Sequence, residues 1–145
     1  MTKHMKPVIS IEAIINLPIE KAWETWTEAQ HICKWNFASP EWHTPRAEND
    51  LRVGGRFTWR MEAKDGSMGF DFWGDYTRID YLEKIEATLG DGRSLVVEFT
   101  DLDGKTKMRE IFEAEETNPV ELQKQGWQAI LDNFKTYAES IFNGK

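Results

Sequence analysis

Three glycine-containing turn signals at regular intervals constrain the fold of this chain more than any other feature. They are Asp65-Gly66, Gly90-Asp91-Gly92 and Asp103-Gly104, and each lies between segments rich in β-branched and aromatic residues. Short turn signals of this kind between apolar runs are typical of β-hairpins. The pattern therefore predicts an antiparallel meander, in which each strand pairs with the next one along the chain.

Seven strands are expected in total, because a β-branched run near the N-terminus adds one strand to the six in the middle of the chain. Gly54-Gly55 separates the second strand from the third, and we expect a bend or bulge there that lets the sheet curl. The predicted strands cover Val8–Ile15, Arg46–Arg52, Arg56–Ala63, Met68–Ile79, Lys84–Leu89, Ser94–Asp101 and Thr106–Ala114.

Two short helices are predicted between the first two strands. Pro18 suits the first position of a helix, where its missing N–H would be unpaired anyway, and apolar residues then recur with helical spacing. A second helix should cover Ala29–Trp35, because the proline-containing segment Trp35–Pro45 cannot continue it. That segment is rich in large rings, so we expect it to fold against the rest of the protein. The apolar positions of the first helix are Ile19, Ala22, Trp23 and Trp26.

A long helix is predicted at the C-terminus, with Asn118 as N-cap, Pro119 at the first helical position, Glu121 three residues after the cap and Gly144 just past the end. Gly126 costs this helix about 1 kcal/mol relative to Ala. We expect either a close backbone approach or a cavity entrance at that point. The apolar face is wide enough to be wrapped by a sheet, which predicts an α+β domain. Its residues are Trp127, Ile130, Leu131, Phe134, Ala138 and Ile141.

Composition predicts one globular domain over residues 1–145 and narrows the classes of partner. The chain has 25 acidic and 18 basic residues, and the basic ones are scattered, so nucleic acid and anionic membranes are not expected partners. No run of about 18 apolar residues occurs and no secretory signal is visible, so we expect neither membrane insertion nor export. The single cysteine, Cys33, cannot form an internal disulfide, which favours the cytoplasm.

In order and spacing, several short motifs together resemble the START-like (SRPBCC, helix-grip) superfamily. They are Pro18 with Ala22-Trp23 and Thr27, Trp35, Asp50-Leu51-Arg52-Val53-Gly54-Gly55-Arg56-Phe57, Gly74-Asp75-Tyr76 and Gly126-Trp127. Within that superfamily, the chain is most similar to proteins related to the C-terminal domain of the activator of the heat-shock protein 90 ATPase.

This resemblance implies a seven-stranded sheet curled around the last helix and a cavity between them, which members use for lipids, polyketides or other apolar molecules. It does not imply one activity, because one fold hosts many functions. Two departures count against a co-chaperone role. The chain has no room for the separate N-terminal domain with which the co-chaperone grips its client, and it lacks a basic patch for an acidic partner.

Residues expected to line the cavity follow from strand alternation, from the apolar face of the last helix and from the ring-rich segment after the second helix. Each ring has the alternative of simply filling the core. The Tyr76 hydroxyl would either orient a ligand or bond to a neighbouring strand. Glu110 would either act as an acid or base on an apolar stripe or reach water at a strand end. The candidates are Trp35, Phe37, His43, Phe57, Trp59, Met61, Phe70, Phe72, Tyr76, Val97, Phe99, Met108, Glu110, Trp127, Ile130 and Phe134.

No catalytic residue, metal or cofactor is assigned from the sequence. His4, His31 and His43 lack the partner four residues away or the neighbouring carboxylate of a helical metal site. No nucleophile elbow, phosphate loop or dinucleotide fingerprint is found.

Three functions are compatible with these observations. The first is a protein that binds a small apolar or aromatic ligand in an internal cavity. The second is an enzyme of cyclase, hydratase or hydrolase type in the same cavity, with Glu110, Tyr76, Arg52 or His43 as acid or base. The third is a stress-related or co-chaperone-like interaction with a protein, which would need an exposed apolar patch.

Overall fold

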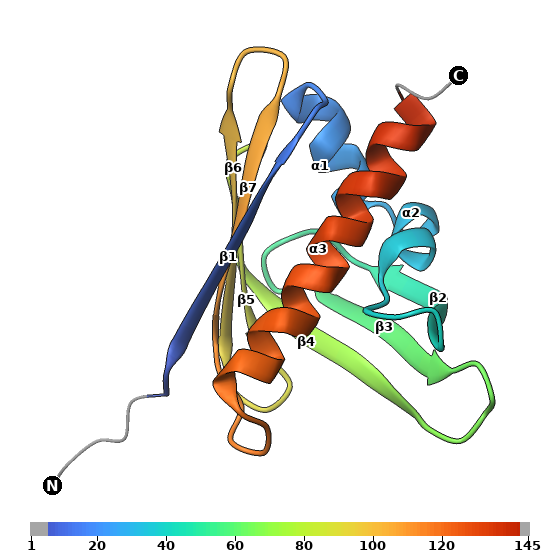
Figure 1. Ribbon diagram of the computed structural model, residues 1–145. Coiled ribbons are helices and arrows are strands. Elements are labelled where there is room, and N and C mark those ends of the chain that lie inside the picture. The colour runs from blue at the N-terminus through green and yellow to red at the C-terminus, as the bar shows by residue number, and fades with distance from the viewer. Residues whose placement is uncertain (1–5, 143–145) are drawn as a thin grey trace, which may run out of the picture.

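The computed structural model describes residues 6–142 and confirms the predicted α+β arrangement. A long C-terminal helix crosses the concave side of a curved sheet, and two short helices follow the first strand (Figure 1). In chain order the elements are β1 (Val8–Ile15), α1 (Ile19–Thr27), α2 (Ala29–Trp35), β2 (Trp42–Asn49), β3 (Arg56–Ala63), β4 (Gly69–Asp80), β5 (Lys84–Leu89), β6 (Ser94–Asp101), β7 (Thr106–Glu113) and α3 (Val120–Phe142).

The sheet has the predicted seven strands, and every pairing is antiparallel. Its order is β1-β7-β6-β5-β4-β3-β2, so β2 to β7 form the expected meander and β1 is added beside β7. In Figure 1 the strands β2, β3 and β4 turn away from the opposite part of the sheet, where β1 lies beside β7, and partly enclose α3. The helix-grip arrangement expected from the sequence is therefore confirmed.

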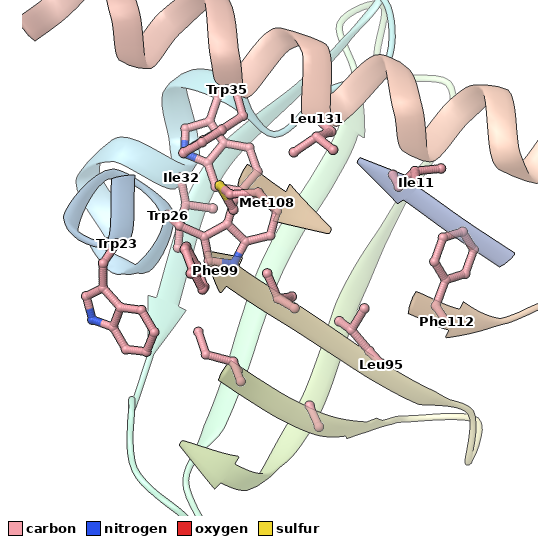
Figure 2. Packing of buried hydrophobic residues seen from close by; sticks show 14 of the residues in the cluster. Ile11, Trp23, Trp26, Ile32, Trp35, Leu95, Phe99, Met108, Phe112 and Leu131 are labelled. Carbon is pink, nitrogen blue, oxygen red and sulfur yellow. The ribbon is translucent and has the colours of Figure 1, made fainter. Parts of the chain in front are cut away.

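Large rings fill one end of the space between the sheet and the helices. Trp26 of α1 stacks on Trp35 of α2 with ring centroids 4.5 Å apart, and Phe134 of α3 meets both rings edge-on at 5.1 Å. Trp23 packs against Phe99 of β6 at 5.0 Å. Figure 2 shows these tryptophans gathered beside Phe99 and Met108. The packing joins all three helices to one half of the sheet.

The second strand begins earlier than predicted, at Trp42 rather than Arg46, and it ends at Asn49 rather than Arg52. The prediction placed Pro45 outside the sheet, at the end of the irregular segment Trp35–Pro45. The strand tolerates Pro45 because β2 is at the edge of the sheet, and its pairing with β3 shifts register between His43 and Arg46.

The predicted start of the last helix was also wrong, by one residue. The backbone N–H of Gln123 donates to the Pro119 carbonyl at 3.1 Å, so Pro119 occupies the cap position and α3 begins at Val120. The Asn118 amide instead donates to Glu115 at 2.8 Å. Pro18 likewise caps α1 rather than beginning it. Gly144, the predicted end signal, lies outside the described residues.

The glycine pair at 54–55 lies in the turn between β2 and β3 rather than in a bulge within a strand. The Gly54 N–H donates to the Tyr76 carbonyl at 2.9 Å, and the Tyr76 N–H donates to the Gly55 carbonyl at 2.9 Å. A Cβ on Gly55 would lie 2.2 Å from the carbonyl oxygen of Asp50. The loop can therefore keep this conformation only because residue 55 has no side chain.

We expect Gly55→Ala to lower the free energy of unfolding by roughly 1–3 kcal/mol, the usual range for overpacking against an atom that cannot move away. The matched control is Gly126→Ala in α3, where an added Cβ meets no atom within 4 Å. This control should raise the free energy of unfolding by up to about 1 kcal/mol through helix propensity. Urea unfolding followed by circular dichroism measures both, and equal stability of the two variants would contradict the argument.

Candidate functional site

A pocket of about 370 Å³ lies between the sheet and the first half of α3. Pockets for small ligands usually measure roughly 300–1,000 Å³, so this one is at the small end of that range. Most of the side chains around it are apolar. The lining residues are Trp26, Trp35, Asn36, Ala38, Phe57, Trp59, Met61, Phe70, Phe72, Tyr76, Ile85, Ala87, Arg93, Leu95, Val97, Glu110, Glu115, Asn118, Gln123, Gly126, Trp127 and Ile130.

Eleven of the sixteen residues named from the sequence line this pocket, because strand alternation and the helical face were identified correctly. Trp26 and Trp35 belong both to the lining and to the packed aromatic cluster, so they form the boundary between the hollow and the filled end of the fold. The eleven are Trp35, Phe57, Trp59, Met61, Phe70, Phe72, Tyr76, Val97, Glu110, Trp127 and Ile130.

The other five candidates do not line the pocket. Phe99, Met108 and Phe134 are buried in the filled end, where α1 and α2 cover the sheet. Phe37 is half-buried beside α3, and its carbonyl accepts a hydrogen bond from Asn133 at 3.5 Å. These four side chains pack against other parts of the protein and do not line the pocket, as the alternative stated in the sequence analysis expected. Which end of the sheet is hollow depends on where α1 and α2 rest, and strand alternation cannot show that.

His43 is the fifth candidate, and its expected position in the cavity lining was wrong. It pairs with Glu62 in the register of β2 and β3, and its Nε2 lies 4.0 Å from the Glu62 carboxylate. Because β2 begins at Trp42, strand alternation puts Trp42 on the inner face and His43 on the outer one. His43 therefore faces away from the pocket.

Phe70 lies at the rim of the pocket rather than inside it. It is 47% exposed, although it shares the inner face of β4 with Phe72. The β3–β4 hairpin extends beyond α3 at this point, so no helix covers the ring, and Phe70 meets Trp42 edge-on at 6.0 Å instead. The pocket thus has an apolar rim on the hairpin side.

Trp59 places an unpaired hydrogen-bond donor in the wall of the pocket. Its side chain is 7% exposed, and its Nε1 has no hydrogen-bond partner within residues 6–142. The contrast with Trp35 is informative, because the Trp35 indole, which is also buried, donates to the Thr25 carbonyl at 3.0 Å. Buried indole N–H groups usually have such a partner.

Glu110 places a buried carboxyl group in the same wall. It lies in the middle of β7 between Ile11 of β1 and Val97 of β6, and it is 3% exposed. Its Oε1 has no hydrogen-bond partner in the described part of the chain, and burial raises the pKa of this carboxyl group to about 8. The alternative of a strand-end carboxylate that reaches water is excluded. At neutral pH the empty pocket therefore holds a largely protonated carboxyl group.

The Tyr76 hydroxyl is occupied by the protein itself. It donates to the Asn49 side-chain oxygen at the end of β2, and burial raises the pKa of Tyr76 well above its usual range. Of the two alternatives stated for this hydroxyl, a hydrogen bond within the sheet is the one observed, although the partner is on β2, which β3 separates from β4. Tyr76 contributes its ring to the pocket wall.

The end of the pocket near the start of α3 is polar, and none of its residues was predicted. Gln123 anchors the loop before α3, because its amide donates to the carbonyls of Glu115 and Asn118 at 3.0 and 2.7 Å. Arg93 donates to Asp91 at 2.8 Å and to the Glu113 carbonyl at 3.1 Å. The sequence gives no signal for this end, because a loop and a turn from distant segments form it.

Gly126 lies on the side of α3 that borders the pocket. A Cβ at this position would meet no atom within 4 Å, so the alternative of a close backbone approach was wrong. The position of Gly126 beside the pocket agrees with the other alternative, a cavity entrance. Gly126 therefore leaves open space where a larger side chain would stand.

The stated reason against a metal site at His31 was incorrect, because carboxylates do lie beside it. His31 Nε2 is 3.8 Å from Glu28, and one ligand atom from each of Glu24, Glu28 and His31 falls within 4.8 Å of the others. The other ring nitrogen of His31 bonds to the Tyr137 hydroxyl at 2.7 Å. Exposed acidic side chains commonly cluster without an ion, so the absence of a metal stays a prediction.

None of the helices within residues 6–142 is long and apolar enough to cross a lipid bilayer.

Comparison with known proteins places the chain in a family. The family described as Activator of Hsp90 ATPase homolog 1-like protein matches residues 16–139. No match was found among curated proteins.

Solved structures share both the fold and part of the sequence. An AHSA1-like protein from Aeromonas hydrophila is 45% identical with a TM-score of 0.87, and the match covers 93% of this chain and 94% of that one. Chr148 from Cytophaga hutchinsonii is 50% identical with a TM-score of 0.80, over 94% and 95% of the two chains. Protein CV1439 from Chromobacterium violaceum, at 19% identity and a TM-score of 0.80 over 90% and 96%, shares the fold alone.

We expect Glu110→Gln to remove a pH-dependent loss of stability. The folded-state pKa of Glu110 is raised above its unfolded value. The stability that the protonated side chain contributes to the folded protein is therefore fully present below about pH 4.5 and is lost as the pH rises through about 8. One pKa unit corresponds to about 1.4 kcal/mol.

The isosteric amide cannot ionise, so the variant should gain stability relative to the wild type between pH 5 and 9. Urea unfolding across this range measures the difference between the two proteins. A difference that stays constant with pH would show that Glu110 is not buried in this way.

Proposed function

The chain belongs to the Activator of Hsp90 ATPase homolog 1-like family, and we propose that it is a binding protein for a small, largely apolar molecule held between the sheet and α3. The family's fold is compatible with such a role. The further parts of the proposal depend on the side chains of this chain.

The observation that carries the proposal is that two residues of the pocket wall each hold a buried polar atom without a partner within residues 6–142. The Trp59 indole nitrogen and the Glu110 Oε1 lack hydrogen bonds within the described residues, and both side chains are more than nine-tenths buried. A buried polar group left unpaired costs roughly 1–3 kcal/mol. A ligand that bonds to either group would recover part of that free energy on binding.

The shape and lining of the pocket support the same proposal. Its walls are formed mainly by aromatic rings and aliphatic side chains, and polar groups are few and localised. Such a combination is typical of small-molecule sites, in which apolar area provides affinity and a few polar atoms fix the orientation of the ligand.

We include a cytoplasmic location in the proposal, because the free thiol of Cys33 and the net charge of -7 agree with it.

Binding is preferred to catalysis because an acid–base reaction needs two groups that converge on one reacting atom. Glu110 would be one such group, but the Tyr76 hydroxyl is bonded to Asn49 and His43 lies on the outer face of the sheet. Arg52 is also exposed and bonded to Asp50. A co-chaperone role rests on the family name alone, and no observation favours it.

The proposal predicts that filling the pocket will abolish binding without unfolding the protein. Gly126→Phe should project a ring into the open space beside Gly126, and helix propensity favours the change. We expect the neutral dye N-phenyl-1-naphthylamine to gain fluorescence with the wild type and to bind at least about tenfold more weakly to the variant, as expected for a lost buried aromatic contact.

Gly126→Ala is the control, because a methyl group leaves most of the space free, and it should bind the dye like the wild type. The melting temperature of each variant shows whether the fold is kept. Failure of the wild type to bind the dye, or unchanged binding by a folded Gly126→Phe variant, would contradict the proposed function.

A further inference from the structure

The charges around the pocket select among apolar ligands. Glu110 takes part in no ion pair within residues 6–142, although its carboxyl group is 3% exposed. Arg93 is the basic residue in the described lining, and its guanidinium is already bonded to Asp91 and to the Glu113 carbonyl. Glu115 adds a second carboxylate at the polar end. Glu115 accepts hydrogen bonds from Asn118 and lies near enough to Arg93 for that positive charge to lower its pKa, so Glu110 is the carboxyl group of the described lining without a basic partner.

We propose that the ligand of this pocket carries a protonated amine on an apolar body and that Glu110 binds this amine as an ion pair. The inference rests on the proposed function, because it names the chemical class of the molecule that the pocket binds. It separates such amines from fatty acids and other apolar carboxylates, whose negative charge would meet no unpaired basic group in the described lining.

Aromatic rings close to Glu110 favour the same choice. Trp127 of α3 lines the pocket and stacks on Phe112 with ring centroids 3.7 Å apart, and Phe112 lies two residues from Glu110 on the same face of β7. The faces of aromatic rings attract cations because their π electrons carry partial negative charge. A cation beside Glu110 would thus meet a carboxylate and aromatic surface, both of which replace the water it leaves.

Binding should release a proton. In the empty pocket Glu110 is largely protonated at neutral pH, and an ion pair with the ammonium group requires the carboxylate form, so the proton leaves to solvent. The neighbours of Glu110 in the sheet, Ile11 and Val97, do not titrate, nor do Trp127 and Ile130, which α3 presents to the pocket.

Two other acidic groups in the lining, Tyr76 and Glu115, should keep their charge states near neutral pH. Burial raises the pKa of Tyr76, and hydrogen bonds from Asn118 lower the pKa of Glu115. We therefore expect the released proton to come from Glu110, and affinity for the amine to rise between pH 6 and 8.

The test compares three ligands with one ring system and different end groups: 2-(1-naphthyl)ethylamine, 2-(1-naphthyl)ethanol and 1-naphthylacetate. Each displaces N-phenyl-1-naphthylamine from the pocket. We expect the amine to bind at least about tenfold more tightly than the alcohol and the carboxylate to bind most weakly, because only the amine supplies the missing opposite charge. Glu110→Gln should remove the preference for the amine and keep binding of the alcohol.

The control variant is Glu98→Gln on the outer face of β6, where Glu98 lies 3.9 Å from Lys84. It makes the same Glu-to-Gln replacement without touching the pocket, so the preference for the amine should remain. Calorimetry in buffers of different ionisation enthalpy should show release of about one proton with the wild type and none with Glu110→Gln.

Two results would overturn the inference: binding of the carboxylate as tight as that of the amine, or an unchanged preference in Glu110→Gln. In both cases the dye still binds and the proposed function survives. Absence of dye binding by the wild type would overturn the proposed function itself, and this inference with it.

Discussion

The contact of Trp35 with Trp26 and Phe134 is the interaction on which the rest of the structure depends. It joins one side chain from each helix, and Trp35 at its centre is fully buried with its indole nitrogen bonded to the Thr25 carbonyl. These rings hold α3 over one end of the curved sheet. Because a helix is stiff and the sheet curls away from it, the fixed end determines how much space remains at the other end. The pocket is that remaining space.

An apolar hollow alone would only weaken the core, since unfilled volume loses packing contacts. Trp59 and Glu110 in the wall of this hollow each hold a polar atom that has no partner in the described part of the chain, and these atoms add a second unfavourable term. Two costs at the same place suggest a site kept for a ligand rather than an imperfectly packed core. Stability and binding are then opposed: filling the space at Gly126, or replacing Glu110, improves the empty protein while damaging the site.

Membership of a family fixes less about function than it does about architecture. Chains with little sequence in common keep this fold, because the sheet, its curl and the long helix depend on general patterns of apolar residues. The ligand depends instead on the few polar side chains of the inner face. In this chain those are a carboxyl group on β7 and an indole N–H on β3, and neither belongs to the pattern that defines the architecture.

The sequence by itself determined the seven strands, the three helices and the inner face of most strands, since alternation and helical spacing are local properties that neighbouring residues set. It also identified Glu110 as an unusual carboxyl group on an apolar stripe. Only the tertiary structure decided that Phe99 and Phe134 fill the core whereas Phe72 lines a pocket, because that depends on where α1 and α2 rest on the sheet. The same holds for the outward position of His43, which follows from its register with β3. Hydrogen-bond partners join distant segments, so local pattern could not reveal which polar groups remain unpaired.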